Sequence, residues 1–247
     1  GINLVERTDK WKSLLDRFDV PIEHSPGVNL LREPDLYARA IDRGDLVDAP
    51  LRKPGYVGLA LAHMRAWERV ARQDRPYLVL EDDATPREGW RRYVTELIAC
   101  VPADFDMLNV NVLRPSGKAI GNGLLRFDGT RAWADAARGR EPNIWLSSYV
   151  ITPHGASRLL ELMRRAKYDY NDVQFDKALM MAMRTHADAG IRLYVVSTTN
   201  RYFVHDESDS DKTSLNDSSA APSSWLLGAA VLLIVLLAVV RGRASPR

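Results

Sequence analysis

The chain has almost no cysteine and almost no net charge. Its 247 residues include one cysteine, Cys100, and 34 lysines and arginines stand against 32 aspartates and glutamates. A single cysteine excludes an intrachain disulfide framework and a zinc site made of cysteines. A net charge of +2, without a basic stripe, gives no indication of nucleic-acid binding. No internal repeat is present, so we expect one ordinary globular core.

A long uncharged run lies near the C-terminus. Residues 225–240 carry no charge, and with the uncharged residues 220–224 they would form a helix of about 31 Å, enough to cross a ~30 Å hydrocarbon core. The run has no polar face, which argues against the alternative of a buried core helix. Arg241 and Arg243 follow it, as on the cytoplasmic flank of a membrane span. We therefore expect a single-pass membrane anchor.

The domain organisation follows from this anchor. We expect a globular domain over residues 1–206, a Ser/Asp-rich tether over 207–224, a transmembrane helix over 225–240 and a short basic tail over 241–247. The sequence leaves open which side of the membrane holds the globular domain. A removed signal peptide would place it outside the cytosol, and a tail anchor without one would leave it in the cytosol.

Apolar spacing alternates between strand and helix along the globular domain. Continuous apolar stretches predict strands near residues 2–4, 77–80, 106–112, 147–152 and 192–197. Spacing at three and four residues predicts helices near 11–18, 36–41, 56–72, 90–101, 153–163 and 172–183. The glycine-rich stretch 117–129 predicts a hairpin or loop. This alternation predicts an α/β domain with a mainly parallel central sheet.

Three consecutive carboxylates, Glu81, Asp82 and Asp83, follow the strand predicted at 77–80. Ligands of open α/β sheets bind beyond the carboxyl ends of the strands. Mg²⁺ commonly takes one or two carboxylates together with substrate phosphates, so we predict a metal site here. The alternative is a solvated turn in which Thr85 and Glu88 form the capping box of the next helix. That alternative accounts for residues 85–88 but not for the three acids.

Two ionisable side chains are predicted on apolar helix faces. His63 shares a face with Trp67 and either contacts a polar group of a ligand or is a satisfied histidine at the edge of the core. Asp176 shares a face with Leu179, which predicts that it points at the core or a cleft. Its pKa would then be liable to shift, as a general base requires. Asp172, one turn earlier, is explained as the N-cap of that helix.

Three further candidates lie at the ends of the domain. Arg7 and Asp9 follow the first strand and would meet a nucleotide, although a solvated loop is the default interpretation. His205 follows the last strand and is a candidate contact to a metal or phosphate.

Five segments, in order, resemble glycosyltransferase family 25, which comprises the lipopolysaccharide-type and procollagen-type galactosyltransferases. They are INLVERTDKW, GYVGLALAHMRAWERV, YLVLEDDATP, SSYVITPHGASRLL and FDKALM. Each segment alone is a weak signal, whereas five in order with similar spacing are specific. Three positions depart from the family pattern: Ala62 replaces a serine, Lys10 replaces an arginine, and Phe175 replaces a small aliphatic residue.

The resemblance implies a GT-A-like fold and an inverting, metal-dependent transfer of a hexose, such as galactose or glucose, from a UDP-sugar to a hydroxyl of a glycan or glycoprotein acceptor. The metal, Mn²⁺ or Mg²⁺, would neutralise the diphosphate leaving group. Carried over by position, Asp83 would be the likeliest direct ligand of the metal, and Glu81 and Asp82 would contact the nucleotide ribose or order the site. An inverting transfer also needs a base, for which Asp176 is the candidate. Together with the candidates above, we predict Asp83, Asp82 and His205 for the metal and Asn3, Arg7, Asp9, His63, Glu81 and Asp82 for the nucleotide sugar.

Two other interpretations stay open. The Ala62 departure leaves room for a non-catalytic, membrane-tethered protein that binds a nucleotide sugar or glycan with the same fold. The segment EDDAT also resembles the Asp-x-Asp-x-Thr loop of phosphatases. Glu81 stands where that chemistry needs an aspartate nucleophile, which argues against a hydrolase of this type.

Overall fold

The computed structural model describes residues 1–136, 145–198 and 203–205. Its helices are α1 (Thr8–Arg17), α2 (Asp35–Asp42), α3 (Pro54–Val70), α4 (Trp90–Cys100), α5 (Gly129–Ala136), α6 (Pro153–Ala166), α7 (Phe175–Thr185) and the short η1 (Ala187–Ala189). Its strands are β1 (Ile2–Asn3), β2 (Ser25–Pro26), β3 (Tyr77–Leu80), β4 (Ala84–Pro86), β5 (Met107–Asn109), β6 (Lys118–Gly121), β7 (Leu124–Arg126), β8 (Ser148–Ile151), β9 (Leu193–Val196) and β10 (Phe203–His205). The α/β class and the predicted strands and helices are confirmed.

The predicted tether and transmembrane helix lie outside the described residues. Within the part of the chain that the structure describes, no helix is both long and apolar enough to span a bilayer.

The central sheet has six strands in the order β3-β8-β5-β9-β7-β6. The β5–β9 pair is parallel, whereas β3–β8, β8–β5, β9–β7 and β7–β6 are antiparallel. The prediction of a mainly parallel sheet is therefore wrong. All four residues of β8 are buried, and a strand buried on both faces is a continuous apolar run whichever way it points. Its reversed direction between β3 and β5 leaves no trace in the hydrophobic pattern.

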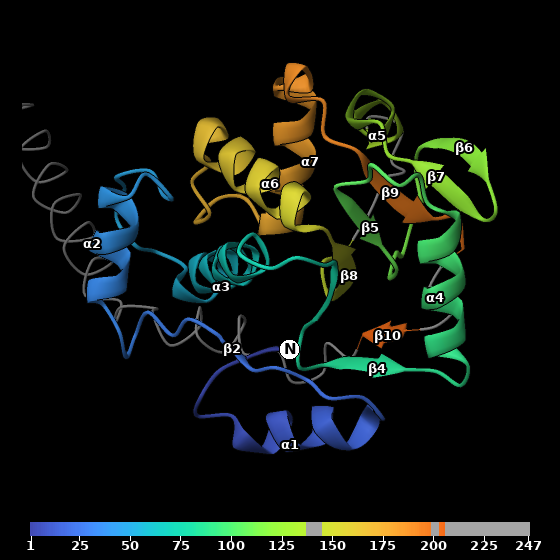
Figure 1. Ribbon diagram of the computed structural model, residues 1–247. Coiled ribbons are helices and arrows are strands. Elements are labelled where there is room, and N and C mark those ends of the chain that lie inside the picture. Colours follow the sequence, from blue (N-terminus) through green and yellow to red (C-terminus); the bar gives the residue numbers. More distant parts are fainter. Residues whose placement is uncertain (137–144, 199–202, 206–247) are drawn as a thin grey trace, which may run out of the picture.

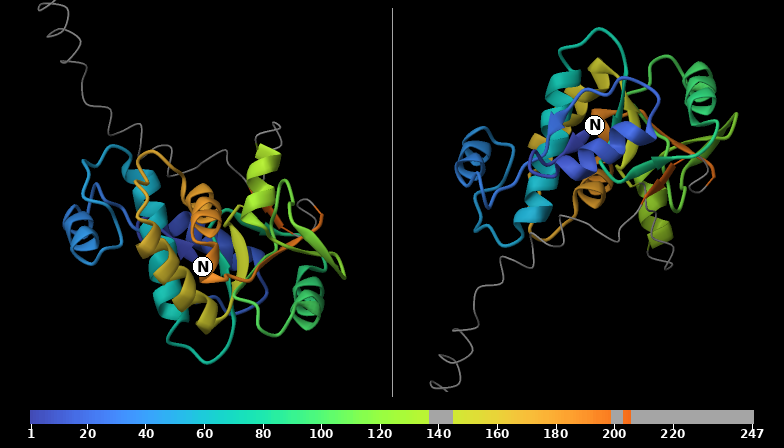
Figure 2. Two further views of the ribbon diagram at one scale, coloured as in Figure 1. Left: turned by 90° about the horizontal axis from the view of Figure 1, so that it is seen from above. Right: turned by 90° about the horizontal axis from the view of Figure 1, so that it is seen from below.

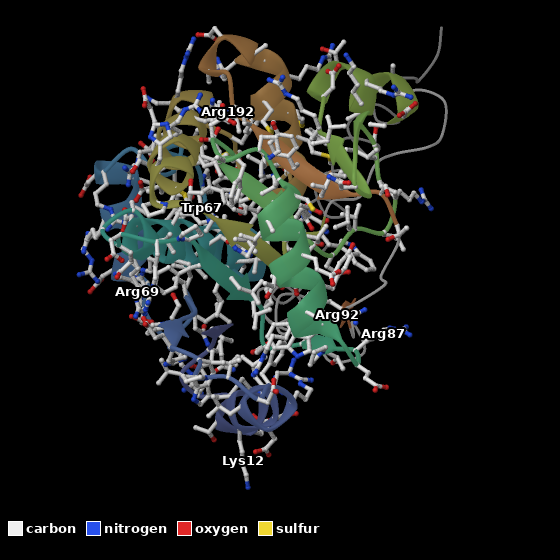
Figure 3. All side chains as sticks on the ribbon, turned by 45° about the vertical axis from the view of Figure 1, so that its right-hand side comes forward. Lys12, Trp67, Arg69, Arg87, Arg92 and Arg192 are labelled. Atoms are coloured by element: carbon white, nitrogen blue, oxygen red, sulfur yellow. The ribbon has the colours of Figure 1, made fainter. Side chains whose placement is uncertain are left out.

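Helices cover both faces of this sheet. Figure 1 shows α3, α6 and α7 grouped on one side and α4 on the other, and the two views of Figure 2 agree. Helix α1 lies apart from both groups, beneath β4 and β10. In Figure 3, Trp67 of α3 lies in the interior, whereas Lys12 and Arg92 extend to the surface. The sheet therefore lies between α4 and the layer formed by α3, α6 and α7.

Two predicted helix caps are wrong. Helix α4 begins at Trp90 after Gly89, which has φ 79°, and Thr85 lies in β4, paired with Val204 of β10. The capping box at residues 85–88 therefore does not form, because a pairing strand far along the chain takes that segment. Helix α7 begins at Phe175 after Gln174. Asp172 is therefore not its N-cap.

A buried asparagine ties the start of α3 to the segment before α7. Asn171 Oδ1 accepts from the backbone N–H groups of Arg52 and Lys53 at 2.7 and 2.8 Å, and its amide nitrogen donates to Pro50 O at 3.2 Å. Arg52 also pairs with Asp172 at 3.0 Å. These contacts fix the entrance of α3 relative to α7, and no pattern in the sequence around Asn171 predicts them.

Helix α3 approaches the chain after β2 at a glycine. A Cβ atom on Gly58 would lie well inside van der Waals distance of the Val28 carbonyl oxygen. Backbone atoms cannot move aside as a flexible side chain can, so this crossing requires a residue without a side chain. Both Gly58 and Val28 border the cleft described below.

Replacing Gly58 with alanine tests this close approach. In an unobstructed helix, Gly→Ala raises stability by up to about 1 kcal/mol. Here we expect Gly58→Ala to lower the free energy of unfolding by about 1–3 kcal/mol, because the added methyl forces α3 and residue 28 apart. Urea unfolding followed by circular dichroism measures the change. A stabilised variant would show that the crossing has room for a side chain.

Candidate functional site

The three predicted acids lie on a turn between β3 and β4. The Ala84 N–H donates to the Glu81 carbonyl at 3.1 Å, which closes the turn, and the Glu81 N–H donates to the Ser147 carbonyl at 2.9 Å. Ile2 of β1 forms a parallel bridge with Glu81. The turn is thus fixed between β1 and the start of β8, at the carboxyl end of β3. Successive side chains on a turn point in different directions, so each acid has its own surroundings.

Asp82 is held by β1 and α1. The Asn3 amide donates to Asp82 Oδ2 at 2.8 Å and to the Arg7 carbonyl at 3.1 Å. The Arg17 guanidinium donates to the Asp82 carbonyl oxygen, and at 3.3 Å to the Thr85 hydroxyl. Asn3 is buried, so its amide is a fixed donor for this carboxylate. Sequence reasoning missed Arg17, because a basic residue in the last turn of a helix is ordinary.

Glu81 is bonded to the histidine predicted on α3. His63 Nε2 lies 3.2 Å from Glu81 Oε1, and His63 Nδ1 lies 2.9 Å from the Tyr149 hydroxyl of β8. The Trp67 indole nitrogen lies 2.8 Å from the same hydroxyl. The histidine side chain is 1% exposed, and its ring stacks on Phe175 with centroids 5.5 Å apart. The structure therefore places His63 behind Glu81, with both ring nitrogens engaged inside the protein.

Asp83 is the last acid of the turn, next to the β4–β10 pair. In that pair Ala84 stands directly opposite His205. The backbone of the predicted histidine ligand thus lies beside the residue that follows Asp83, although the two are far apart in the sequence. Among the described side chains, no group of three His, Cys, Asp or Glu residues could hold a metal ion. A cation here would have few protein ligands and would need oxygen ligands from the substrate. Mg²⁺ is usually bound in this way, by one or two carboxylates together with substrate phosphates.

A cleft opens in front of the acid turn. It contains about 590 Å³ of space that no protein atom fills, including its open mouth. All three acids line it, together with Lys10 of α1 and small residues of α3 that include Gly55, Gly58 and Ala62. Lys10 brings a cationic group to a cleft whose rim carries three carboxylates. The small residues leave backbone within reach of a ligand, as a bulkier helix face would not.

Arg7 and Asp9 form a pair at the start of α1. Arg7 Nε lies 3.2 Å from Asp9 Oδ1, and the two side chains are 23% and 68% exposed. The hydrogen bond from Arg7 lowers the pKa of Asp9 below its ordinary value. Neither residue is among the described residues that line the cleft, so their contact with a nucleotide stays a prediction.

Asp176 lies in the first turn of α7, next to Phe175, whose ring stacks on His63. The start of α7 is therefore close to the residue behind Glu81. The Asp176 carboxylate accepts from the Lys177 N–H at 2.8 Å and is partly exposed. It is not among the described residues that line the cleft, so its role as a base stays a prediction from its place on the apolar face of the helix.

Comparison with known proteins bears on the predicted family. The chain is similar to a curated protein from Anopheles gambiae named Glycosyltransferase 25 family member. The predicted resemblance to glycosyltransferase family 25 is confirmed. The two sequences are 27% identical over 199 residues, which is 71% of this chain and 31% of that protein. The chain thus spans under a third of this relative's length. No protein-family model matches the chain.

Asn3 provides a test of how the acid turn is held. We expect Asn3→Leu, which keeps the approximate size, to lower the free energy of unfolding by about 1–3 kcal/mol, because Asp82 and the Arg7 carbonyl lose their shared donor. Urea unfolding of both proteins gives the difference. Asn3→Leu should also lower the affinity for any ligand that the turn binds. An unchanged midpoint of unfolding would show that the amide does not support the turn.

Proposed function

We propose that this chain contains the nucleotide-sugar-binding part of a metal-dependent glycosyltransferase that transfers a hexose from a UDP-sugar to a hydroxyl of a glycan or protein acceptor. The observation that carries the proposal is the turn of three carboxylates at the carboxyl end of β3, lining a cleft together with Lys10. The similarity to a protein named Glycosyltransferase 25 family member supports the same function. The proposal names the transferred sugar only by its class, a hexose.

The three acids are proposed to have different roles, one in binding the metal and two in binding the donor substrate. Asp83, with His205 across the β4–β10 pair, would hold Mn²⁺ or Mg²⁺. When bound, such an ion supplies positive charge to the diphosphate leaving group. Lys10 would approach the same phosphates from α1. Asp82, oriented by Asn3 at 2.8 Å, and Glu81, bonded to His63, would accept hydrogen bonds from the donor substrate.

A transfer to a hydroxyl also requires that a proton be removed from the acceptor. Asp176 is the proposed base, since it lies at the start of α7, one residue from the ring that packs against His63. Its carboxylate would accept the proton as the acceptor oxygen attacks the sugar from the face opposite the diphosphate, which inverts the configuration. The acceptor would therefore approach between α7 and the cleft.

Anchoring to a membrane is proposed from the sequence. Residues 225–240 form an uncharged run that would cross a bilayer together with the residues before it. The domain of residues 1–206 would then act close to a membrane surface.

A second candidate function is binding without turnover. Ala62 lines the cleft at a position where the family pattern has a serine, so one hydroxyl is missing from the wall. A protein that binds UDP-sugar with metal but neither transfers nor hydrolyses it would have this second function.

The first test replaces Asp83. We expect Asp83→Ala to abolish sugar transfer and Mn²⁺-dependent UDP binding, with the circular dichroism spectrum unchanged, because the proposed ion loses its main protein ligand. Transfer is measured with UDP-hexoses and a panel of glycan acceptors, and binding by titration calorimetry. The control is Asp74→Ala, an exposed acid outside the cleft. Full activity of Asp83→Ala, or full activity of the unmodified chain in excess chelator, contradicts the metal role.

The second test separates binding from chemistry. We expect Asp176→Asn to keep the affinity for UDP within about twofold and to lower kcat by at least about a hundredfold, as loss of a general base does. Steady-state kinetics gives kcat, and titration calorimetry gives the affinity. If kcat is unchanged, Asp176 is not the base. If the unmodified chain binds UDP-sugar but shows no turnover with any acceptor, the second candidate function is favoured.

A further inference from the structure

A chain of buried polar groups runs from the core to the acid turn. Trp67 and His63 are on α3, Tyr149 is on β8, and Glu81 follows the end of β3. Trp67 and Tyr149 are fully buried, and His63 is almost so. The three links are the Trp67–Tyr149 contact of 2.8 Å, the Tyr149–His63 contact of 2.9 Å and the His63–Glu81 contact of 3.2 Å.

The chemistry of these groups fixes the direction of every hydrogen bond. An indole N–H only donates, so the Tyr149 oxygen accepts from Trp67. The Tyr149 hydroxyl hydrogen is then left for His63 Nδ1, which must accept it. A neutral imidazole that accepts at Nδ1 carries its hydrogen on Nε2, and that hydrogen points to Glu81. Burial also raises the pKa of Tyr149 above its ordinary value, so the phenol keeps its proton.

The opposite direction is unfavourable. If His63 Nδ1 carried a hydrogen and donated to Tyr149, the phenol oxygen would accept from both His63 and Trp67. Its own hydrogen would then have no acceptor among the described residues, inside a fully buried site. A buried donor without an acceptor is costly. The other histidine tautomer would also present the Nε2 lone pair to the Glu81 carboxylate, which repels it.

Aromatic packing prevents the histidine ring from turning over. Phe175 of α7 stacks on His63 with ring planes 14° apart, and the same phenyl ring contacts Trp67 at 5.3 Å between centroids. A rotation of the imidazole by half a turn about its Cβ–Cγ bond would exchange its nitrogens for ring carbons and break both links. This is a structural reason for an aromatic side chain at residue 175.

We propose that Trp67 and Tyr149 are positioning residues that fix the tautomer of His63 and thereby hold Glu81 as a hydrogen-bond acceptor facing the cleft. An acceptor of this kind selects a ligand group that donates, such as a hydroxyl of a sugar or ribose, and disfavours a deoxy or carbonyl group at the same point. The ligand class rests on the proposed function, whereas the direction of the hydrogen-bond chain does not. Trp67 and Tyr149 do not line the cleft and act only through His63.

The tautomer can be observed without any substrate. We expect the ¹⁵N spectrum of histidine-labelled protein to show His63 protonated at Nε2 and unprotonated at Nδ1. Tyr149→Phe should move the Nδ1 signal toward that of a lone pair without a hydrogen-bond donor, because Nδ1 loses its partner while Glu81 still accepts from Nε2–H. The matched control is Tyr170→Phe, since Tyr170 is also buried and also packs against Phe175, at 5.6 Å. Its hydroxyl has no hydrogen-bond partner in the described residues, so the His63 signal should stay unchanged.

Two results would overturn the proposal at this stage. One is an Nδ1-protonated His63 in the unmodified chain. The other is a His63 signal that Tyr149→Phe leaves as it was, in a variant whose circular dichroism spectrum shows that it is folded. If Tyr149→Phe does not fold, Trp67→Phe takes its place: it keeps the Tyr149–His63 link, and we expect the Nε2 tautomer to persist with a smaller shift.

Substitution of His63 itself tests the link to the ligand. A glutamine offers an oxygen that accepts from Tyr149 and an N–H that donates to Glu81, so His63→Gln keeps both hydrogen bonds in their direction. A phenylalanine keeps the ring and loses both. With UDP and Mn²⁺ as the probe, we expect His63→Phe to raise Kd by about tenfold and His63→Gln to restore most of the affinity. Equal losses in both variants would contradict the proposed role.

The two readouts keep this inference separate from the proposed function. If the unmodified chain does not bind UDP, the nucleotide-sugar function fails and the hydroxyl-selecting role of Glu81 fails with it. The assignment of the His63 tautomer then stands or falls on the ¹⁵N spectrum alone.

Discussion

The structure around the cleft depends on the need to satisfy three adjacent carboxylates at the end of one strand. Carboxylates that lose water without gaining partners cost several kcal/mol each. For two of the three, the fold supplies donors from separate elements: Asn3 from β1 for Asp82, and His63 from α3 for Glu81. Arg17 from α1 fixes the backbone of the same turn. The acid turn therefore connects β1, α1 and α3 through hydrogen bonds.

Helix α3 is the element on which this arrangement most depends. Gly58 lets it approach the chain at Val28, its small residues form a wall of the cleft, and His63 and Trp67 extend from its buried face. The contacts of Asn171 with the backbone of residues 52 and 53 hold the start of the helix in place. A shift of α3 along its axis would thus change the cleft wall and the support of Glu81 together. The positions of the cleft wall and of Glu81 therefore depend on how α3 packs away from the cleft.

Much of this could be predicted from the sequence, and the failures have common physical causes. Local signals placed β3, α3, α6 and the acids correctly, because apolar periodicity and a run of charges are properties of neighbouring residues. The direction of β8 could not be predicted, since a fully buried strand has the same pattern either way. The pairing of β4 with β10 overrode a plausible helix cap at Thr85 for a second reason, because the partner strand is distant in the chain.

At the candidate site, too, local signals could be predicted and contacts between distant residues could not. The residue types at Glu81, Asp82 and Asp83 indicated a binding site, and the structure places all three at one cleft. Their individual partners could not be predicted, because Asn3 and Tyr149 carry no local signal of what they contact. His63 was expected either to contact a ligand or to be a satisfied histidine at the edge of the core, and it lies behind Glu81 with both ring nitrogens bonded inside the protein. Burial, which decides between these two roles, depends on packing and not on residue type.

The most direct test of the central claim is thermal unfolding of the unmodified chain with UDP, once with Mn²⁺ and once with excess chelator. If the acid turn holds an ion and a diphosphate together, UDP with Mn²⁺ raises Tm, with a stabilisation of about 2.7 kcal/mol at a hundredfold excess over Kd. UDP with chelator should leave Tm almost unchanged. An equal rise in both conditions would contradict the role of a metal, and no rise in either would contradict nucleotide binding at the cleft.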